Sequence, residues 1–368
     1  MSSTDVWNGV SVFGRGRVVW DTAGFQFLAV SLTSGIVLAE FPDLQASKLS
    51  YRFEETTSET VMIPWRNIPS NWVEATVPYG VAILLVRGST VLWGGIVVKR
   101  ERTLEDNGLS LTLATVEHYL DSVYVKDHVY SNRDQCEIVK DLVSSTLEGH
   151  RFTLSVEVSP SSIHRDRTYE ESSDKTLLSV LQELSNVQNG PEWCTAWRVD
   201  DDRYTPVLTV ADRIGSVSPV TTFEESVMTA FKIVEDYTSG YGANMVWAVG
   251  DKTGETQLRS DTMVAEQSYR PVVEHIVRPS SSITQKETLN DHASASLRQL
   301  RDGTNTMSMT LSLLAAPIVY KEWRPGDVVA WTVSDDDGRF TGFDYGEARV
   351  VGYDIDFSGV WTITPVLQ

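Results

Sequence analysis

The sequence predicts a mainly β protein with an α+β middle unit, built from antiparallel β-barrel domains and a small α+β domain. Three observations lead there: strand and turn patterns from residue 25 to about 125, helical patterns between 127 and 215, and alternating apolar runs after 216. Because 368 residues exceed the usual size of one core, we expect several folded units. Their predicted bounds are an N-terminal arm at 1–24, a first β-barrel domain at 25–126, an α+β domain at 127–215, and a second β-barrel domain at 216–368 with a helix near 284–302.

Turns punctuate the first β region. A Thr-Ser-Gly turn at 33–35 follows the apolar run FQFLAVS, and Gly88 lies in the turn after VAILLV. Asn107 and Gly108 form the dipeptide that best supplies the two positive φ angles of a type I′ hairpin. Successive hairpins of this kind predict an antiparallel meander able to close into a barrel.

Helical periodicity occurs in three places. The first helix is expected to begin at the N-cap Asp134 and to end at Gly149. The second carries leucine and valine at intervals of three and four residues over 177–187, before an Asn-Gly-Pro stop. The third begins at a capping box formed by Thr284 and Glu287 and closes at Gly303.

The stretch GYGANMVWAVGDKTGE, residues 240–255, could be a ligand-binding glycine loop or a strand of the scaffold. Met245, Trp247 and Val249 share one face of a strand, and Val246 and Ala248 share the other. Its glycines stand where a strand would begin and turn. Because both faces are apolar, we expect a scaffold strand buried between layers.

Composition narrows the function classes. Fifty acidic and thirty-one basic residues give a net charge of −19, which repels phosphate backbones and anionic lipids, so a dedicated nucleic-acid binder is not expected. Cys136 and Cys194 stand far apart without a CxxC motif or clustered histidines, and we interpret both as buried thiols without a disulfide. No secretory signal is visible, and Pro78 and Arg87 interrupt the longest weakly charged run, so no membrane span is expected.

Motifs of catalysis and ligand binding are missing from the sequence. GRGR at 14–17 lacks the third glycine, the lysine and the following helix of a phosphate loop. The acidic runs 200–202 and 335–337 lack the alternating acids of a calcium loop and are interpreted as solvated hairpin tips. Neither GxSxG nor HExxH occurs. We therefore predict no catalytic, cofactor-binding or metal-binding residues and no enzyme, although fifty carboxylates leave a glycosidase open.

The histidines are interpreted as surface or core residues. They are His118, His128, His150, His164, His275 and His292. His128 and His164 lie in polar, loop-like sequence and are the first candidates for a catalytic role if there is one.

Six stretches follow one another in a recognisable order. They are VLWGGIVVKRE, VEHYLDSVYVKD, RTYEESSDKTLLSVLQELSNVQNGPEW, VMTAFKIVEDYTSGYGAN, TLNDHASASLRQLRDG and WRPGDVV. Over about residues 25–335 this order resembles the minor tail proteins of siphophages that infect actinobacteria, in the group of tail-tip and baseplate hub proteins. The resemblance implies a homotrimer in which two tube-type β-barrels per chain form a pseudo-sixfold ring that continues the tail tube, with α+β domains on its outside.

The same resemblance implies partners and a location. It implies contacts with a distal tail protein, the tape-measure protein and receptor-binding or other minor tail proteins, passage of DNA through the lumen, and no cofactor. The protein would be made in the host cytoplasm and lie at the virion tail tip. The acidity would then let an anionic duplex slide without sticking, or it would serve solubility alone.

Two other function classes stay open beside the hub. One is a tail-associated hydrolase. The other is a carbohydrate- or receptor-binding β protein, in which Trp65, Trp72 or Trp93 would stack on sugar rings. Trp93 lies in an apolar hairpin, so core packing is expected for it.

Overall fold

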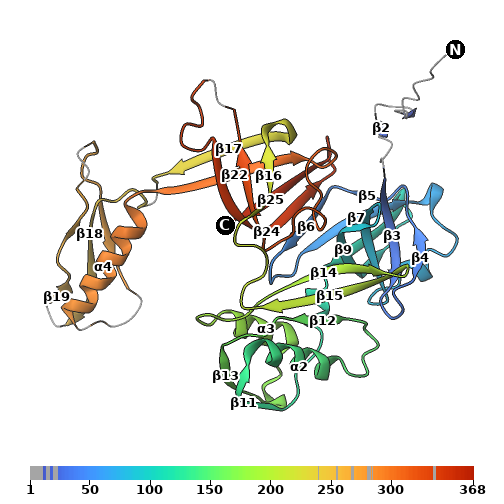
Figure 1. The fold of residues 1–368 in the computed structure, drawn as a ribbon, viewed down its shortest axis with the longest axis horizontal. Coiled ribbons are helices and arrows are strands. Elements are labelled where there is room, and N and C mark those ends of the chain that lie inside the picture. Colours follow the sequence, from blue (N-terminus) through green and yellow to red (C-terminus); the bar gives the residue numbers. More distant parts are fainter. Residues whose placement is uncertain are drawn as a thin grey trace. The chain divides into compact units, whose positions relative to one another are not determined.

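The computed structural model describes residues 11–13, 17–19, 24–238, 240–253, 256–266, 269–279, 283, 285–334 and 337–368 (Figure 1). The chain is mainly β and divides into two compact units. Unit 1 comprises Met1–Thr229 and Thr310–Gln368, and unit 2 comprises Ala230–Met309. Within the predicted N-terminal arm, strand β1 (Ser11–Phe13) pairs antiparallel with β2 (Arg17–Val19).

The first sheet of unit 1 has seven strands, in the order β4-β3-β8-β9-β10-β7-β5, and each neighbouring pair is antiparallel. The strands are β3 (Phe25–Ser31), β4 (Val37–Glu40), β5 (Gln45–Ala46), β7 (Ser58–Pro64), β8 (Val81–Arg87), β9 (Thr90–Glu101) and β10 (Gly108–Ala114). Strand β8 is an unbroken apolar run because both of its faces are buried. The short helices η1 (Trp65–Asn67) and η2 (Glu74–Thr76) lie between β7 and β8 in the chain.

Unit 1 contains a curled half-barrel sheet, and its closure into a tube-type barrel stays a prediction (Figure 1). The turn expected at Gly88 is confirmed: Arg87 pairs with Thr90, and Gly88 has a φ of 60°. The type I′ turn expected at Asn107 and Gly108 is wrong. Gly108 opens β10 opposite Pro64, and neither Asn107 nor Gly108 is among the described residues with positive φ. The link from β9 to β10 is a longer loop, so the dipeptide did not decide its geometry.

The middle segment of unit 1 combines short strands and helices. Strand β11 (His128–Asp134) pairs with β13 (His164–Tyr169), and a second small sheet has the order β12-β15-β14. The remaining elements are α1 (Glu117–Leu120), α2 (Gln135–Leu147), β12 (Ser155–Val158), η3 (Glu171–Ser173), α3 (Leu177–Ser185), β14 (Glu192–Asp200) and β15 (Arg203–Ala211). The expected N-cap is confirmed, because the Asp134 carboxylate accepts from the backbone N–H groups of Cys136 and Glu137. Leu142, Leu181 and Trp193 lie in the core between α2, α3 and these strands.

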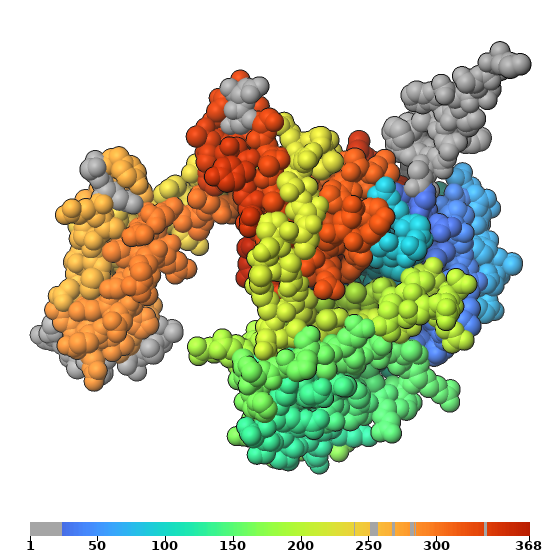
Figure 2. All heavy atoms as spheres, in the orientation of Figure 1, coloured from blue at the N-terminus to red at the C-terminus, as the bar shows by residue number. Residues whose placement is uncertain are grey.

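The C-terminal sheet has the order β16-β23-β24-β25-β22-β17, and residues 230–236 and 304–309 of its strands β17 and β22 belong to unit 2. Its strands are β16 (Pro219–Glu224), β17 (Met228–Asp236), β22 (Thr304–Ser312), β23 (Val328–Thr332), β24 (Tyr345–Asp356) and β25 (Thr362–Leu367), with η4 (Glu225–Val227) between β16 and β17. Strand β6 (Lys48–Arg52), from the N-terminal part of the chain, also pairs with β24, so that Tyr51 lies opposite Tyr353. In Figure 2 the yellow segment around β16 lies along the red and orange C-terminal strands, as its parallel pairing with β23 requires.

Unit 2 packs one helix on a small sheet. Strand β18 (Met245–Thr253) pairs with β19 (Thr256–Arg259), β20 (Met263–Val264) and β21 (Glu274–Val277), and α4 (Lys286–Leu300) follows. Val246 and Ala248 are buried with Leu289 and Ala293 of α4. The scaffold strand predicted around 245–249 is therefore present. Its second face is less covered than expected, because Trp247 is only half-buried.

The helix expected near 284–302 is confirmed as α4, but Thr284 of its predicted capping box lies outside the described residues. Helix α4 belongs to the compact unit 2, whereas the sequence analysis predicts it inside the second β-barrel domain. Strand β6 joins a sheet that belongs mainly to the C-terminal part. The predicted domain boundaries at 24, 126 and 215 do not coincide with the boundaries of the two compact units. The division into four parts stays a prediction.

Candidate functional site

The structure keeps the two histidine candidates apart. In the β11–β13 ladder His128 lies opposite Tyr169, and His164 lies opposite Asp134 at the other end. The His128 Nε2 is 2.9 Å from the Ser145 Oγ on α2, a contact between residues 17 positions apart that no sequence motif signals. The Ser145 hydroxyl also lies 2.6 Å from the Asp141 carbonyl oxygen. Backbone N–H groups inside a helix are already used by helical hydrogen bonds, so they cannot stabilise an oxyanion beside Ser145. This pair is a structural contact.

The cysteines, the acidic runs and the GRGR stretch are the remaining candidate positions. Cys136 and Cys194 are both free; Cys136 is buried as predicted, whereas Cys194 is half-buried. Burial raises the pKa of each thiol to about 12. Asp201 and Asp202 turn the chain between β14 and β15 with positive φ, which confirms that hairpin tip. At 335–337 only Asp337 is described, and at 14–17 only Arg17 is.

The described residues contain neither a metal-binding cluster nor a membrane-spanning helix. Across the described residues, no group of three or more His, Cys, Asp and Glu side chains is placed to hold a metal ion. None of the described helices has the length and apolar character needed to cross a bilayer.

The tryptophans divide between core and surface. Trp93 is buried, and its Nε1 donates to the Ser50 carbonyl oxygen at 2.8 Å, which confirms the expected core packing. Trp65 and Trp72 are half-buried and meet edge to face, with ring centroids 5.5 Å apart. They are the tryptophans among the sugar-binding candidates that keep an exposed side.

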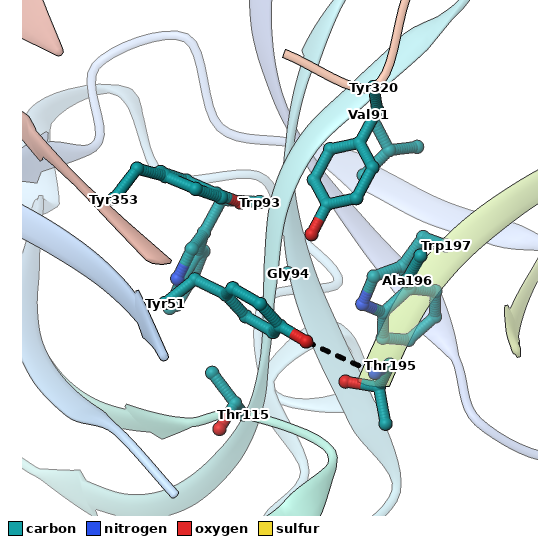
Figure 3. Close-up of a pocket in the computed structure, with 10 residues that line it drawn as sticks. All are labelled: Tyr51, Val91, Trp93, Gly94, Thr115, Thr195, Ala196, Trp197, Tyr320 and Tyr353. Carbon is teal, nitrogen blue, oxygen red and sulfur yellow. Dashed lines mark hydrogen bonds between the residues drawn. The ribbon is translucent and has the colours of Figure 1, made fainter. Parts of the chain in front are cut away.

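A small cavity lies where the first sheet, β14 and the C-terminal sheet meet (Figure 3). Its volume is about 10 Å³, room for one water molecule. The Tyr51 hydroxyl accepts from the Thr195 backbone N–H at 3.1 Å, and the Tyr51 and Tyr353 rings stack 5.7 Å apart. Thr195 donates from its hydroxyl to Glu117, and burial raises the pKa of that carboxyl. The cavity joins layers and has no room for a substrate.

An open pocket of about 420 Å³ is lined by residues of the middle segment and of β24. Arg349 from β24 makes a two-pronged contact with Glu192 from β14, with one N–O distance of 2.7 Å. Glu54 lines the same pocket, accepts from the Trp193 backbone N–H at 3.0 Å, and burial raises its pKa to about 7. Sequence reasoning missed this group because Glu54, Glu192 and Arg349 come from distant parts of the chain. Arg349 holds Glu192 in an ion pair that connects β24 to β14. This ion pair is called the latch.

This arrangement of sheets is similar to that of solved phage tail proteins and of a type VI secretion protein. The chain is similar to a 43 kDa tail protein of prophage MuSo2 from Shewanella oneidensis, with 11% identity, a TM-score of 0.53, and coverage of 94% of this chain and 98% of that one. It is also similar to a tail protein from Neisseria meningitidis, with 13% identity, a TM-score of 0.51, and coverage of 94% and 97%.

A third similar structure is an E. coli type VI secretion component, itself described as similar to tail proteins of phage T4. Its identity is 10%, its TM-score is 0.50, and coverage is 93% of this chain and 76% of that one. No protein-family model matches the chain, and neither does any curated protein. At these identities the likeness establishes the fold, and the narrower resemblance to actinobacterial siphophages stays a prediction.

Proposed function

We propose that this chain is a structural hub of a non-contractile phage tail. Three copies would form a ring that continues the tail tube at the virion tip. The ring would bind the distal tail protein, the tape-measure protein and receptor-binding or other minor tail proteins. Genomic DNA would pass through its lumen to the host.

The observation that carries the proposal is the fold, which two tail proteins share over 94% of this chain. Two further features support a scaffold role. The Ser145 hydroxyl forms a hydrogen bond within α2, and Arg349 forms an ion pair with Glu192 between two strands. Both contacts stabilise the fold. The net charge of −19 suits a channel for an anionic duplex.

The first test is the mass of the purified protein by light scattering, with negative-stain class averages from the same fraction. A ring of three copies with a central hole is the expected result. A monomer at every concentration, also in the presence of the distal tail protein, would contradict the proposal.

DNA passage has its own test. Acidic residues that line the hole of such a ring would be changed to lysine in the phage, because cations bind the phosphate backbone. Slower DNA release is expected, with a stronger effect at low salt. Unchanged release kinetics would leave solubility as the only role of the acidity.

A further inference from the structure

Two arginines and two tryptophans form an arginine–tryptophan patch on unit 1, defined as Trp65, Trp72, Arg100 and Arg102. The guanidinium groups of Arg100 and Arg102 lie 5.6 and 5.3 Å from the Trp72 ring centroid. Arg100 donates to the Val73 carbonyl oxygen at 2.8 Å, which is a neutral partner. Neither arginine forms an ion pair with a carboxylate in the described part of the chain.

Aliphatic side chains surround the patch. Val73 and Val77 are each 42% exposed, and Leu38 of the edge strand β4 is 37% exposed. Asn71 ties the two segments together, because its Nδ2 donates to the Leu38 carbonyl oxygen at 2.8 Å. Tryptophan and arginine beside exposed aliphatic groups make up the composition of protein–protein contact centres.

An acidic hollow of about 570 Å³ lies elsewhere on unit 1, lined by Asp127, Val129, Thr168, Tyr169, Glu170, Glu171 and Ser172. Asp127 accepts from the Glu171 backbone N–H at 2.7 Å, which fixes the rim. Among the described residues, no basic side chain forms an ion pair with Asp127, Glu170 or Glu171.

One feature suits the acidic hollow to a protein partner. Val129 at its edge is 77% exposed, although it is apolar. An exposed apolar side chain beside carboxylates suits a partner surface that carries both positive charge and apolar groups.

The two surfaces complement each other in charge and in apolar character. Guanidinium groups bind carboxylates with paired, charge-assisted hydrogen bonds. Among the described residues, no ion pair joins the two surfaces within one chain. We propose that the arginine–tryptophan patch of one copy docks into the acidic hollow of the next copy. The inference rests on the proposed ring, and it names the contact that builds it: two different surfaces meeting head to tail generate a ring when the rotation closes.

A second copy is the proposed partner because one chain carries both the basic surface and the acidic surface. Copies of a chain with net charge −19 repel one another, so self-association needs a place where unpaired cations face unpaired anions. The arginine–tryptophan patch supplies the cations, and the acidic hollow supplies the anions.

The test uses charge reversal in the full chain, followed by sedimentation over a range of concentrations. Arg102→Glu is expected to weaken self-association by about tenfold or more, and so is Glu171→Lys. Arg298→Glu, the same charge change on an exposed arginine of α4, is the matched control and should have no effect. The chain carrying both Arg102→Glu and Glu171→Lys should regain association, because the ion pair is rebuilt with its sign inverted.

The outcomes separate this inference from the function on which it rests. A wild-type ring that Arg102→Glu leaves intact overturns the inference and keeps the hub. A wild-type chain that never associates contradicts both. Loss of binding to a polyanionic glycan in Arg102→Glu, with self-association unchanged, overturns the docking contact and makes the patch a glycan site. Circular dichroism of each variant checks that it is folded.

Discussion

Replacing Arg349 with methionine is expected to lower the free energy of unfolding by about 3–5 kcal/mol. The guanidinium holds Glu192 by two hydrogen bonds, and it also donates to the carbonyl oxygens of Gly326 at 3.0 Å and Ile214 at 2.9 Å. Its side chain is 14% exposed and that of Glu192 is 25% exposed, so water replaces these bonds poorly. The variant leaves a carboxylate and two carbonyl groups without their partner, which is where the cost arises.

Urea unfolding followed by tryptophan fluorescence measures this loss. A second variant, Arg349→Met with Glu192→Leu, removes both charges and should recover a large part of the stability, because no unpaired charge then stays buried. Arg66→Met is the control, since Arg66 is exposed. A loss below about 1 kcal/mol in Arg349→Met, the size of a surface ion pair, would refute the latch.

Three further changes test the fold. Burial raises the pKa of Glu54 from 4.5 to about 7, so the wild type loses stability as pH rises from about 4.5 to 7. Glu54→Gln should abolish this loss, about 3 kcal/mol between urea unfolding at pH 4.5 and pH 8. Gly94→Ala drives a methyl group into Trp197 and should cost about 1–3 kcal/mol, whereas Gly359→Ala, with open space around it, should cost almost nothing in thermal unfolding. Leu289→Ala should cost unit 2 about 2–5 kcal/mol, read from faster amide exchange in β18, and unchanged exchange would contradict the packing of α4.

Local signals predicted local structure well. The helix N-cap at Asp134 and the tight turn at Gly88 depend on neighbours a few residues away, and both are present. The dipeptide of Asn107 and Gly108 misled, because the strand register of Gly108 opposite Pro64 decided where the turn could fall. Turn propensity is a small term beside the pairing of a whole strand.

Contacts between distant segments were beyond sequence reasoning. Arg349 and Glu192 are 157 positions apart, and no periodicity links them. The acidic hollow and the arginine–tryptophan patch likewise depend on which loops the fold brings together. Local sequence motifs do not mark these polar groups, because their pairing and pKa shifts arise from burial and from the geometry of the fold.

Strand β6 has a consequence for how the protein is made. A ribosome completes residues 48–52 early, but their partner strand β24 is made about 300 residues later. Until then one side of β6 has no native partner, and a pairing across such a sequence distance forms slowly. Strand β6 can therefore join the C-terminal sheet only after β24 has left the ribosome, so this part of the sheet forms late.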